Sequence, residues 1–160
     1  MVIRVLSLFA FLLVPAAESG LERRDYALDV SLPRKVFQQG EPIELTAVFK
    51  NLSGRAVTIW SSGFWPNHKL VVTDDQGIEA EFTTVGRRCR LAFDPQGRKR
   101  RKNVPRVVEP GASLEVCSGI DLSKLYRLPP GRYKVQLTYD DRQPPTPIMV
   151  ESGFVTFDAR

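Results

Sequence analysis

The feature of this sequence that most constrains its fold is an alternation of apolar and polar positions that returns at short intervals. In residues 40–51, an apolar side chain stands at every second position from Ile43 to Phe49. A period of two is typical of an extended strand with one buried face. Gly40 precedes this stretch and residues 51–54 (Asn-Leu-Ser-Gly) follow it, and these residue types favour turns. The stretch is therefore predicted to be a strand between two turns.

The same plan of turn, strand and turn recurs along the chain. Only one helical turn is expected, at residues 121–126, with Asp121 as its N-cap. Strands are predicted at residues 26–32, 43–50, 56–60, 69–73, 78–82, 113–118, 133–139 and 154–157. The sequence shows no amphipathic helix of normal length. We therefore predict an all-β protein, an antiparallel β-sandwich of about seven or eight strands with one long basic loop at residues 85–106.

The N-terminus differs from the rest of the chain. Residues 5–14 form an apolar run interrupted by one serine, which is too short to span a bilayer. A proline and small residues follow it, so residues 1–19 are predicted to be a signal peptide cleaved after Ser19. An uncleaved membrane anchor is the alternative. Residues 20–25 are expected to be a flexible N-terminus and residues 26–158 the sandwich domain. The mature chain should contain no membrane span and should be periplasmic or extracellular.

The cysteine content agrees with export. Cys89 and Cys117 are the two cysteines of the chain. An even number of cysteines in an oxidising compartment favours a disulfide, and we predict one between them. A loop of that length would stabilise the fold by about 3–4 kcal/mol in the chain-entropy description. The alternative is two buried thiols on separate strands. No histidine lies near either cysteine in the sequence, which disfavours a zinc site.

The second half of the chain carries motifs that resemble a known fold. These motifs are Pro110-Gly111-Ala112-Ser113, Leu122-Ser123, Tyr126, Leu128, Pro130-Gly131, Tyr133 and Val135. Over residues 28–157 the chain resembles the immunoglobulin-like β-domain that precedes the catalytic domain of deuterolysin-like metallopeptidases. It is also similar in layout to the bacterial intracellular proteinase inhibitor family. The resemblance implies an immunoglobulin-like sandwich with a tyrosine corner, in which the Tyr133 hydroxyl bonds to the backbone of residues 128–130.

Catalysis is disfavoured by the composition. His68 is the single histidine, so a metallopeptidase helix with two histidines cannot form. No serine near it carries the glycines of a nucleophile elbow, and no phosphate-binding or dinucleotide motif is present. Two acidic pairs, Asp74-Asp75 and Asp140-Asp141, stand at predicted strand ends, where turn chemistry explains them better than calcium binding. We therefore expect no enzymatic activity, no cofactor and no metal.

Positive charge gathers in the predicted basic loop. Its net charge of +8, nine cations less the single anion Asp94, exceeds the +5 of the whole chain. The predicted anion- or partner-binding residues are Arg87, Arg88, Arg90, Arg98, Lys99, Arg100, Arg101, Lys102 and Arg106. Charge at this density favours an anionic partner, such as a protein or an anionic component of the cell envelope. Nucleic acid is not expected for an exported chain. The alternative is a long solvated loop.

An aromatic group offers a second possible contact. Phe64 and Trp65 stand in a predicted loop, close in sequence to Trp60, and could contact a sugar or a protein. The alternative, which we favour, is that these rings belong to the core. The expected function is therefore that of a non-enzymatic binding or accessory protein. Its rivals are a peptidase inhibitor that presents residues 64–68, and a structural envelope component that pairs through a sheet edge.

Overall fold

The alternating stretch of the sequence forms a central strand of the fold. The computed structural model describes residues 25–61, 63–95, 104–142 and 147–160. In strand β3 (Glu44–Asn51), the side chains of Leu45, Ala47 and Phe49 are completely buried. Hydrophobic burial on this side of the strand follows directly from the period of two. Strand β3 is the middle strand of an antiparallel sheet, in which it pairs with β1 (Tyr26–Ser31) and β7 (Ser113–Asp121).

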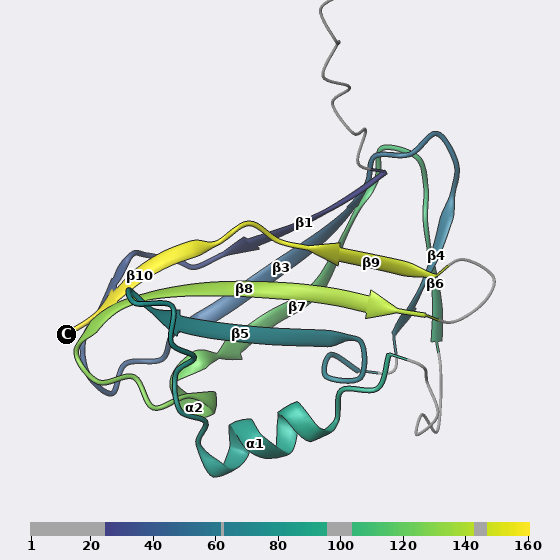
Figure 1. Ribbon diagram of the computed structural model, residues 1–160. Helices are drawn as coiled ribbons and strands as arrows, with labels where there is room; N and C mark the ends of the chain where they lie inside the picture. The colour runs from purple at the N-terminus through teal and green to yellow at the C-terminus, as the bar shows by residue number, and fades with distance from the viewer. Residues whose placement is uncertain (1–24, 62, 96–103, 143–146) are drawn as a thin grey trace, which may run out of the picture.

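A second sheet packs against the first, and Figure 1 shows the two lying one behind the other. Its strand order is β2 (Val36–Phe37), β10 (Val155–Ala159), β8 (Gly131–Asp141) and β5 (His68–Asp74). Strand β9 (Ile148–Glu151) also pairs with β8. All pairs in this sheet are antiparallel except β10 with β2. The architecture is an immunoglobulin-like antiparallel β-sandwich, which confirms the predicted fold class.

The core lies between the two sheets. On β8, the side chains of Tyr133, Val135, Leu137 and Tyr139 are all buried, as their spacing in the sequence predicts. The ring of Tyr139 meets that of Phe49 on the opposite sheet, edge to face, with 5.9 Å between the ring centroids. Such aromatic pairs add to the free energy that their buried area contributes. Contacts of this kind hold β3 and β8 together across the sandwich.

A third, two-stranded sheet extends one end of the molecule. Strands β4 (Val57–Ser61) and β6 (Val104–Val108) pair antiparallel and turn away from β3 and β7. The turn is built on Asn51, whose side chain is completely buried. Its amide Nδ2 donates to the carbonyl oxygens of Arg55 (2.8 Å) and Val108 (2.9 Å). Its Oδ1 accepts from the backbone N–H (3.0 Å) and the hydroxyl (2.7 Å) of Ser53. The side chain of Asn51 thus connects the segment between β3 and β4 with the segment between β6 and β7.

Two short helices lie beside β5 at one side of the sandwich (Figure 1). They are α1 (Thr84–Leu91) and α2 (Leu122–Leu125), and they pack against each other. Helix α2 is the predicted helical turn, and Asp121 caps it by accepting from the N–H of Ser123 at 3.0 Å. Within the described ranges, no helix is long and apolar enough to cross a membrane.

The tyrosine corner is confirmed. The hydroxyl of Tyr133 donates to the carbonyl oxygen of Pro129 at 2.7 Å, within the segment that the resemblance indicated. This bond closes the turn that leads into β8.

Several local predictions were wrong. The described part of the chain contains ten strands, more than the seven or eight expected, because the short strands β2, β6 and β9 were not predicted. Residues 78–82 form no regular strand. Glu79 bridges to Thr73 whereas Phe82 bridges to Tyr126, so the two ends of this segment pair with different partners. The predicted basic loop is also interrupted, because its first part is helix α1.

Candidate functional site

Helix α1 carries the first part of the predicted basic segment. Thr83 is its N-cap, and the Thr83 hydroxyl oxygen accepts from the N–H of Gly86 at 3.1 Å. The same hydroxyl donates to the carbonyl oxygen of Lys124 at 2.6 Å, and the backbone N–H of Thr83 donates to that of Leu125 at 2.9 Å. The start of α1 is therefore bonded directly to α2. The N-cap and the bonds from Thr83 to α2 together explain why a helix forms in a segment rich in arginine.

Gly86 allows the two helices to touch. It is the buried residue of α1, and a Cβ at this position would lie 2.0 Å from the carbonyl oxygen of Leu125. Real Cβ atoms do not approach a backbone atom so closely. Glycine is thus required here for close approach, and the sequence contains no local signal for this contact.

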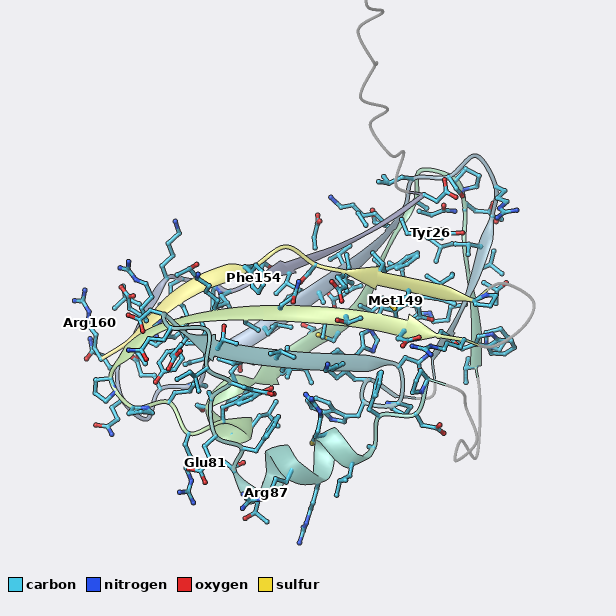
Figure 2. The ribbon with its side chains drawn as sticks, viewed as in Figure 1. Tyr26, Glu81, Arg87, Met149, Phe154 and Arg160 are labelled. Carbon is cyan, nitrogen blue, oxygen red and sulfur yellow. The ribbon has the colours of Figure 1, made fainter. Side chains whose placement is uncertain are left out.

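The opposite side of α1 faces solvent. It presents Thr84, Arg87, Arg88 and Leu91, residues that share one side of a helix because they lie three and four positions apart. We call these four residues the arginine face. Figure 2 shows Arg87 on the side of α1 that points away from the sheets. Within the described ranges, the side chains of Arg87 and Arg88 make no hydrogen bond and no ion pair. Two neighbouring residues of α1 therefore carry guanidinium groups that are open to solvent.

The other predicted cations are placed differently. Arg90 turns toward the sandwich, with its Nη1 3.4 Å from both a carboxylate oxygen of Glu79 and the carbonyl oxygen of Leu70. Arg106 is exposed on β6, a separate element. Arg98, Lys99, Arg100, Arg101 and Lys102 lie outside the described residues. Of the four predicted cations that the structure describes, Arg87 and Arg88 thus share one open face.

The predicted disulfide is absent, and both cysteines are free. Cys117 lies in β7 in the core, where its thiol points toward the carbonyl oxygen of Leu45 at 3.8 Å. Cys89 lies on α1 and is half-buried. Burial raises the pKa of Cys89 and raises that of Cys117 to about 11. Both thiols stay protonated at neutral pH, which makes them poor nucleophiles.

The aromatic segment 64–68 turns its side chains inward. Phe64 and Trp65 are half-buried and pack against the core, with their rings edge to face at 4.8 Å. The ring of Phe64 also stacks on that of His68, with 4.3 Å between centroids and 8° between planes. Asn67 is completely buried, and His68 is 5% exposed. These rings therefore belong to the edge of the core, which agrees with the interpretation that we favoured from the sequence.

Next to this segment lies a group of buried polar side chains that the sequence did not indicate. The amide of Asn67 donates to the carbonyl oxygen of Trp60 (3.0 Å) and to Oδ2 of Asp141 (3.1 Å). The hydroxyl of Tyr139 also donates to Oδ2 of Asp141 at 3.1 Å and accepts from the backbone N–H of Trp60 at 3.2 Å. Burial raises the pKa of Tyr139, which keeps this donor protonated. The pairing of β5 with β8 assembles the group, because it sets His68 opposite Tyr139.

His68 carries an unsatisfied acceptor inside this group. Its Nδ1 lies 2.7 Å from the carbonyl oxygen of Phe64, and a carbonyl oxygen can only accept. The proton of the neutral ring is therefore assigned to Nδ1, which leaves a lone pair on Nε2. Nε2 is buried and has no hydrogen-bond partner among the described residues. Burial lowers the pKa of His68 to about 4, so the ring is neutral at physiological pH.

This histidine predicts a pH dependence of stability. Between pH 6.5 and about 4, the unfolded chain binds a proton on His68 that the folded chain does not bind. Stability should therefore fall as the pH falls through this window, by about 3 kcal/mol in total, and level off for this group below about pH 4. Urea denaturation at pH values from 7 to 5 measures the slope. His68 is the single histidine, so a His68→Phe variant should have a nearly flat profile over the same range. Equal slopes in the two proteins would contradict the assignment.

A pocket of about 200 Å³ opens beside His68. Its wall is formed mainly by apolar and aromatic side chains, namely Ile59, Trp60, Phe64, Val116 and Tyr139, together with His68. Gly63 and Leu114 also line it, as do the exposed residues Arg106 and Glu115, whose opposite charges leave the lining without a net charge. We call this space the His68 pocket. It lies between β4, β7 and the start of β5.

No protein-family model matches the sequence, and no curated protein matches it. Among solved structures, the fold is similar to that of a CARDB domain from Pyrococcus furiosus, determined in solution by NMR, with a TM-score of 0.39 and 15% sequence identity. The similarity covers 84% of this chain and 94% of the other. The resemblance to the β-domain of deuterolysin-like metallopeptidases and to the proteinase inhibitors therefore stays a prediction.

Proposed function

We propose that this chain is an exported, non-enzymatic binding or accessory protein that holds an anionic partner on the arginine face of α1. The observation that carries the proposal is the open pair of guanidinium groups, Arg87 and Arg88, on a helix that is bonded to the body of the protein. Guanidinium groups bind phosphate and carboxylate through two parallel hydrogen bonds. A helix held by Thr83 and Gly86 presents the backbone of both residues already ordered, so binding loses the conformational entropy of their side chains alone.

The electrostatic surroundings support an external partner. The acidic residues just before α1 already have partners: Glu79 pairs with Arg90 and Glu81 with Arg127, each at 3.4 Å. The charges of Arg87 and Arg88 are therefore left uncompensated by these neighbours. The predicted signal peptide supports a partner outside the cytosol, and an anionic component of the cell envelope has the matching charge.

The rival functions have less support. A peptidase inhibitor that used residues 64–68 would need their side chains to enter an active-site cleft. Phe64 and Trp65 are instead packed against the core, and Asn67 and His68 are buried. A structural envelope component would use a free sheet edge, and no feature of the described edges distinguishes them from ordinary exposed strands.

The proposal predicts a salt-dependent loss of binding when the arginine face is neutralised. The Arg87→Gln/Arg88→Gln protein should bind phosphatidylglycerol vesicles about ten- to thirty-fold more weakly than the wild type at low salt. Each cation near such a surface contributes about 1 kcal/mol. Wild-type binding should also weaken steeply with added salt. Sedimentation with vesicles, and capture from an envelope extract over a salt series, measure both effects.

A control variant with the same change in net charge shows whether vesicle binding depends on the arginine face or on the net charge of the protein. Lys35→Gln/Arg55→Gln removes two exposed cations away from α1, since Arg55 lies in the connection from β3 to β4 at the other end of the molecule (Figure 1). This protein should keep most of the wild-type affinity. Equal losses in the two double variants would mean that net charge alone drives binding. Unchanged binding in the Arg87/Arg88 variant would refute the proposed surface.

A further inference from the structure

The arginine face contains an exposed apolar side chain, that of Leu91, which binding of an anion does not explain. This side chain is 76% exposed, more than any other large apolar side chain that the structure describes. Leu91 follows Arg87 by four positions and Arg88 by three, so it neighbours both arginines on the surface of α1. Val85, three positions before Arg88, is also 52% exposed. Exposed cations and exposed apolar side chains are therefore mixed on one short helix.

The position of Leu91 is more informative than its exposure alone. Single exposed leucines are common on soluble proteins and need no explanation. Here the leucine adjoins two guanidinium groups that make no ion pair within the described ranges. A partner that matches the whole face must offer negative charge at its surface and apolar material just below it. An anionic lipid bilayer has this layering, because its phosphate groups lie directly above the hydrocarbon chains.

The size and the place of the face favour a bilayer over a folded protein. A helix of eight residues is about 12 Å long and about 10 Å wide. A stable protein interface covers about 800 Å² on each partner, several times what such a face provides. A bilayer needs no such area, because each cation near an anionic surface strengthens binding about five-fold by itself. Figure 1 shows α1 outside β5 and α2, where its length can lie along a flat surface.

We propose that the arginine face docks on an anionic lipid bilayer, with Arg87 and Arg88 on lipid phosphates and the side chain of Leu91 inserted between the headgroups. This inference rests on the proposed function and deepens it by naming the partner. The long apolar stems of the arginines let their charged ends stay at the phosphates while the helix comes close to the surface. Binding then has an electrostatic part, which salt weakens, and an apolar part, which salt does not screen.

A substitution of Leu91 that keeps the charge tests the apolar part. Leu91→Gln conserves net charge and helix propensity, and at an exposed position it should leave the unfolding temperature unchanged. This variant should bind phosphatidylglycerol vesicles about five- to twenty-fold more weakly than the wild type. Its affinity should fall with added salt as steeply as that of the wild type, because the cations are the same.

The matched control removes an equally exposed apolar side chain elsewhere. Met149 of β9 is 62% exposed, and Figure 2 shows it across β8 and β5 from Arg87. Met149→Gln should therefore keep the wild-type affinity for the vesicles. Equal losses in Leu91→Gln and Met149→Gln would overturn the proposal, because apolar surface anywhere on the protein would then have the same effect.

A tryptophan in place of Leu91 measures depth directly. Brominated acyl chains quench an indole ring that reaches the hydrocarbon. The wild type, with Trp60 and Trp65, gives the background. Vesicles with brominated chains should quench Leu91→Trp beyond that background, and its emission should shift to the blue on binding. Quenching no greater than in the wild type would overturn the insertion of this side chain.

The same vesicle titrations distinguish this inference from the proposed function. If Leu91→Gln binds as tightly as the wild type while Arg87→Gln/Arg88→Gln loses affinity, the anionic partner stands and docking by insertion is refuted. Heparin, a soluble acidic polysaccharide, should bind the wild type and Leu91→Gln equally, because it has no hydrocarbon layer. Weaker heparin binding by Leu91→Gln would show that Leu91 acts without a bilayer and would refute its insertion. If neither variant loses affinity for vesicles, both proposals fall.

Discussion

Replacement of Asn51 with alanine should lower the free energy of unfolding by about 3 kcal/mol. The side chain is completely buried and makes four hydrogen bonds at the corner where β3 passes into β4 and β6 passes into β7. Alanine leaves the carbonyl oxygens of Arg55 and Val108 without this donor. Each buried polar group that loses its partner costs about 1–3 kcal/mol.

Urea denaturation of the wild type and of Asn51→Ala measures this loss. The matched control is Ser53→Ala, which removes one hydroxyl from the same corner and leaves both amide donations of Asn51 in place. This control should lower stability by less than about 1 kcal/mol. If Asn51→Ala stays within about 0.5 kcal/mol of the wild type, the corner is not held by this side chain.

Replacement of Gly86 with alanine should destabilise the protein, although the same change usually stabilises a helix. In an ordinary helix interior, alanine is favoured over glycine by about 0.8–1 kcal/mol. At Gly86 the new Cβ would lie 2.0 Å from the carbonyl oxygen of Leu125 and 2.9 Å from Cδ1 of Phe82. The first of these atoms is backbone and cannot move without shifting α2. We expect a net loss of about 2 kcal/mol or more, the range found when a packed interior is overfilled.

The decisive observation is whether Gly86→Ala lowers or raises the free energy of unfolding. Hydrogen exchange shows which elements of the protein lose stability. Amides of α1 should lose protection in Gly86→Ala, while those of β3 and β8 should change little. Val85→Ala, at an exposed position of the same helix, should stay within about 0.5 kcal/mol of the wild type. A stabilised Gly86→Ala protein would mean that α1 does not pack closely on α2. Because the arginine face depends on that packing, its affinity for anionic vesicles should fall in the same variant.

Much of the sandwich could be predicted from local patterns. The alternation of apolar residues located β1, β3, β5, β7 and β8 to within a few residues, because burying one face of a strand requires a period of two. Local chemistry also predicted the Asp121 cap and the Tyr133 corner, in which a side chain bonds to backbone only a few residues away. Both features depend on short-range geometry that a few residues determine.

The candidate sites could not be predicted in the same way. Nothing near Gly86 in the sequence indicates that the backbone of Leu125 will touch it, so a helix in the basic segment was missed. The short strands β2, β6 and β9 were also missed, because in so few residues a strand is defined by its partner rather than by its own pattern. The predicted disulfide failed for a related reason: an even number of cysteines carries no information about whether their side chains meet.

The sequence by itself determined the class of fold and the excess of positive charge in one segment, since both depend on residue type and spacing along the chain. Only the tertiary structure decided which charges lie open, how Asn51 holds its corner, and that His68 is buried beside a pocket with a free acceptor. These properties depend on residues far apart in sequence, such as His68 and Tyr139, that strand pairing brings together. The pKa and hydrogen bonding of a side chain are set by such neighbours, and chain order does not specify them.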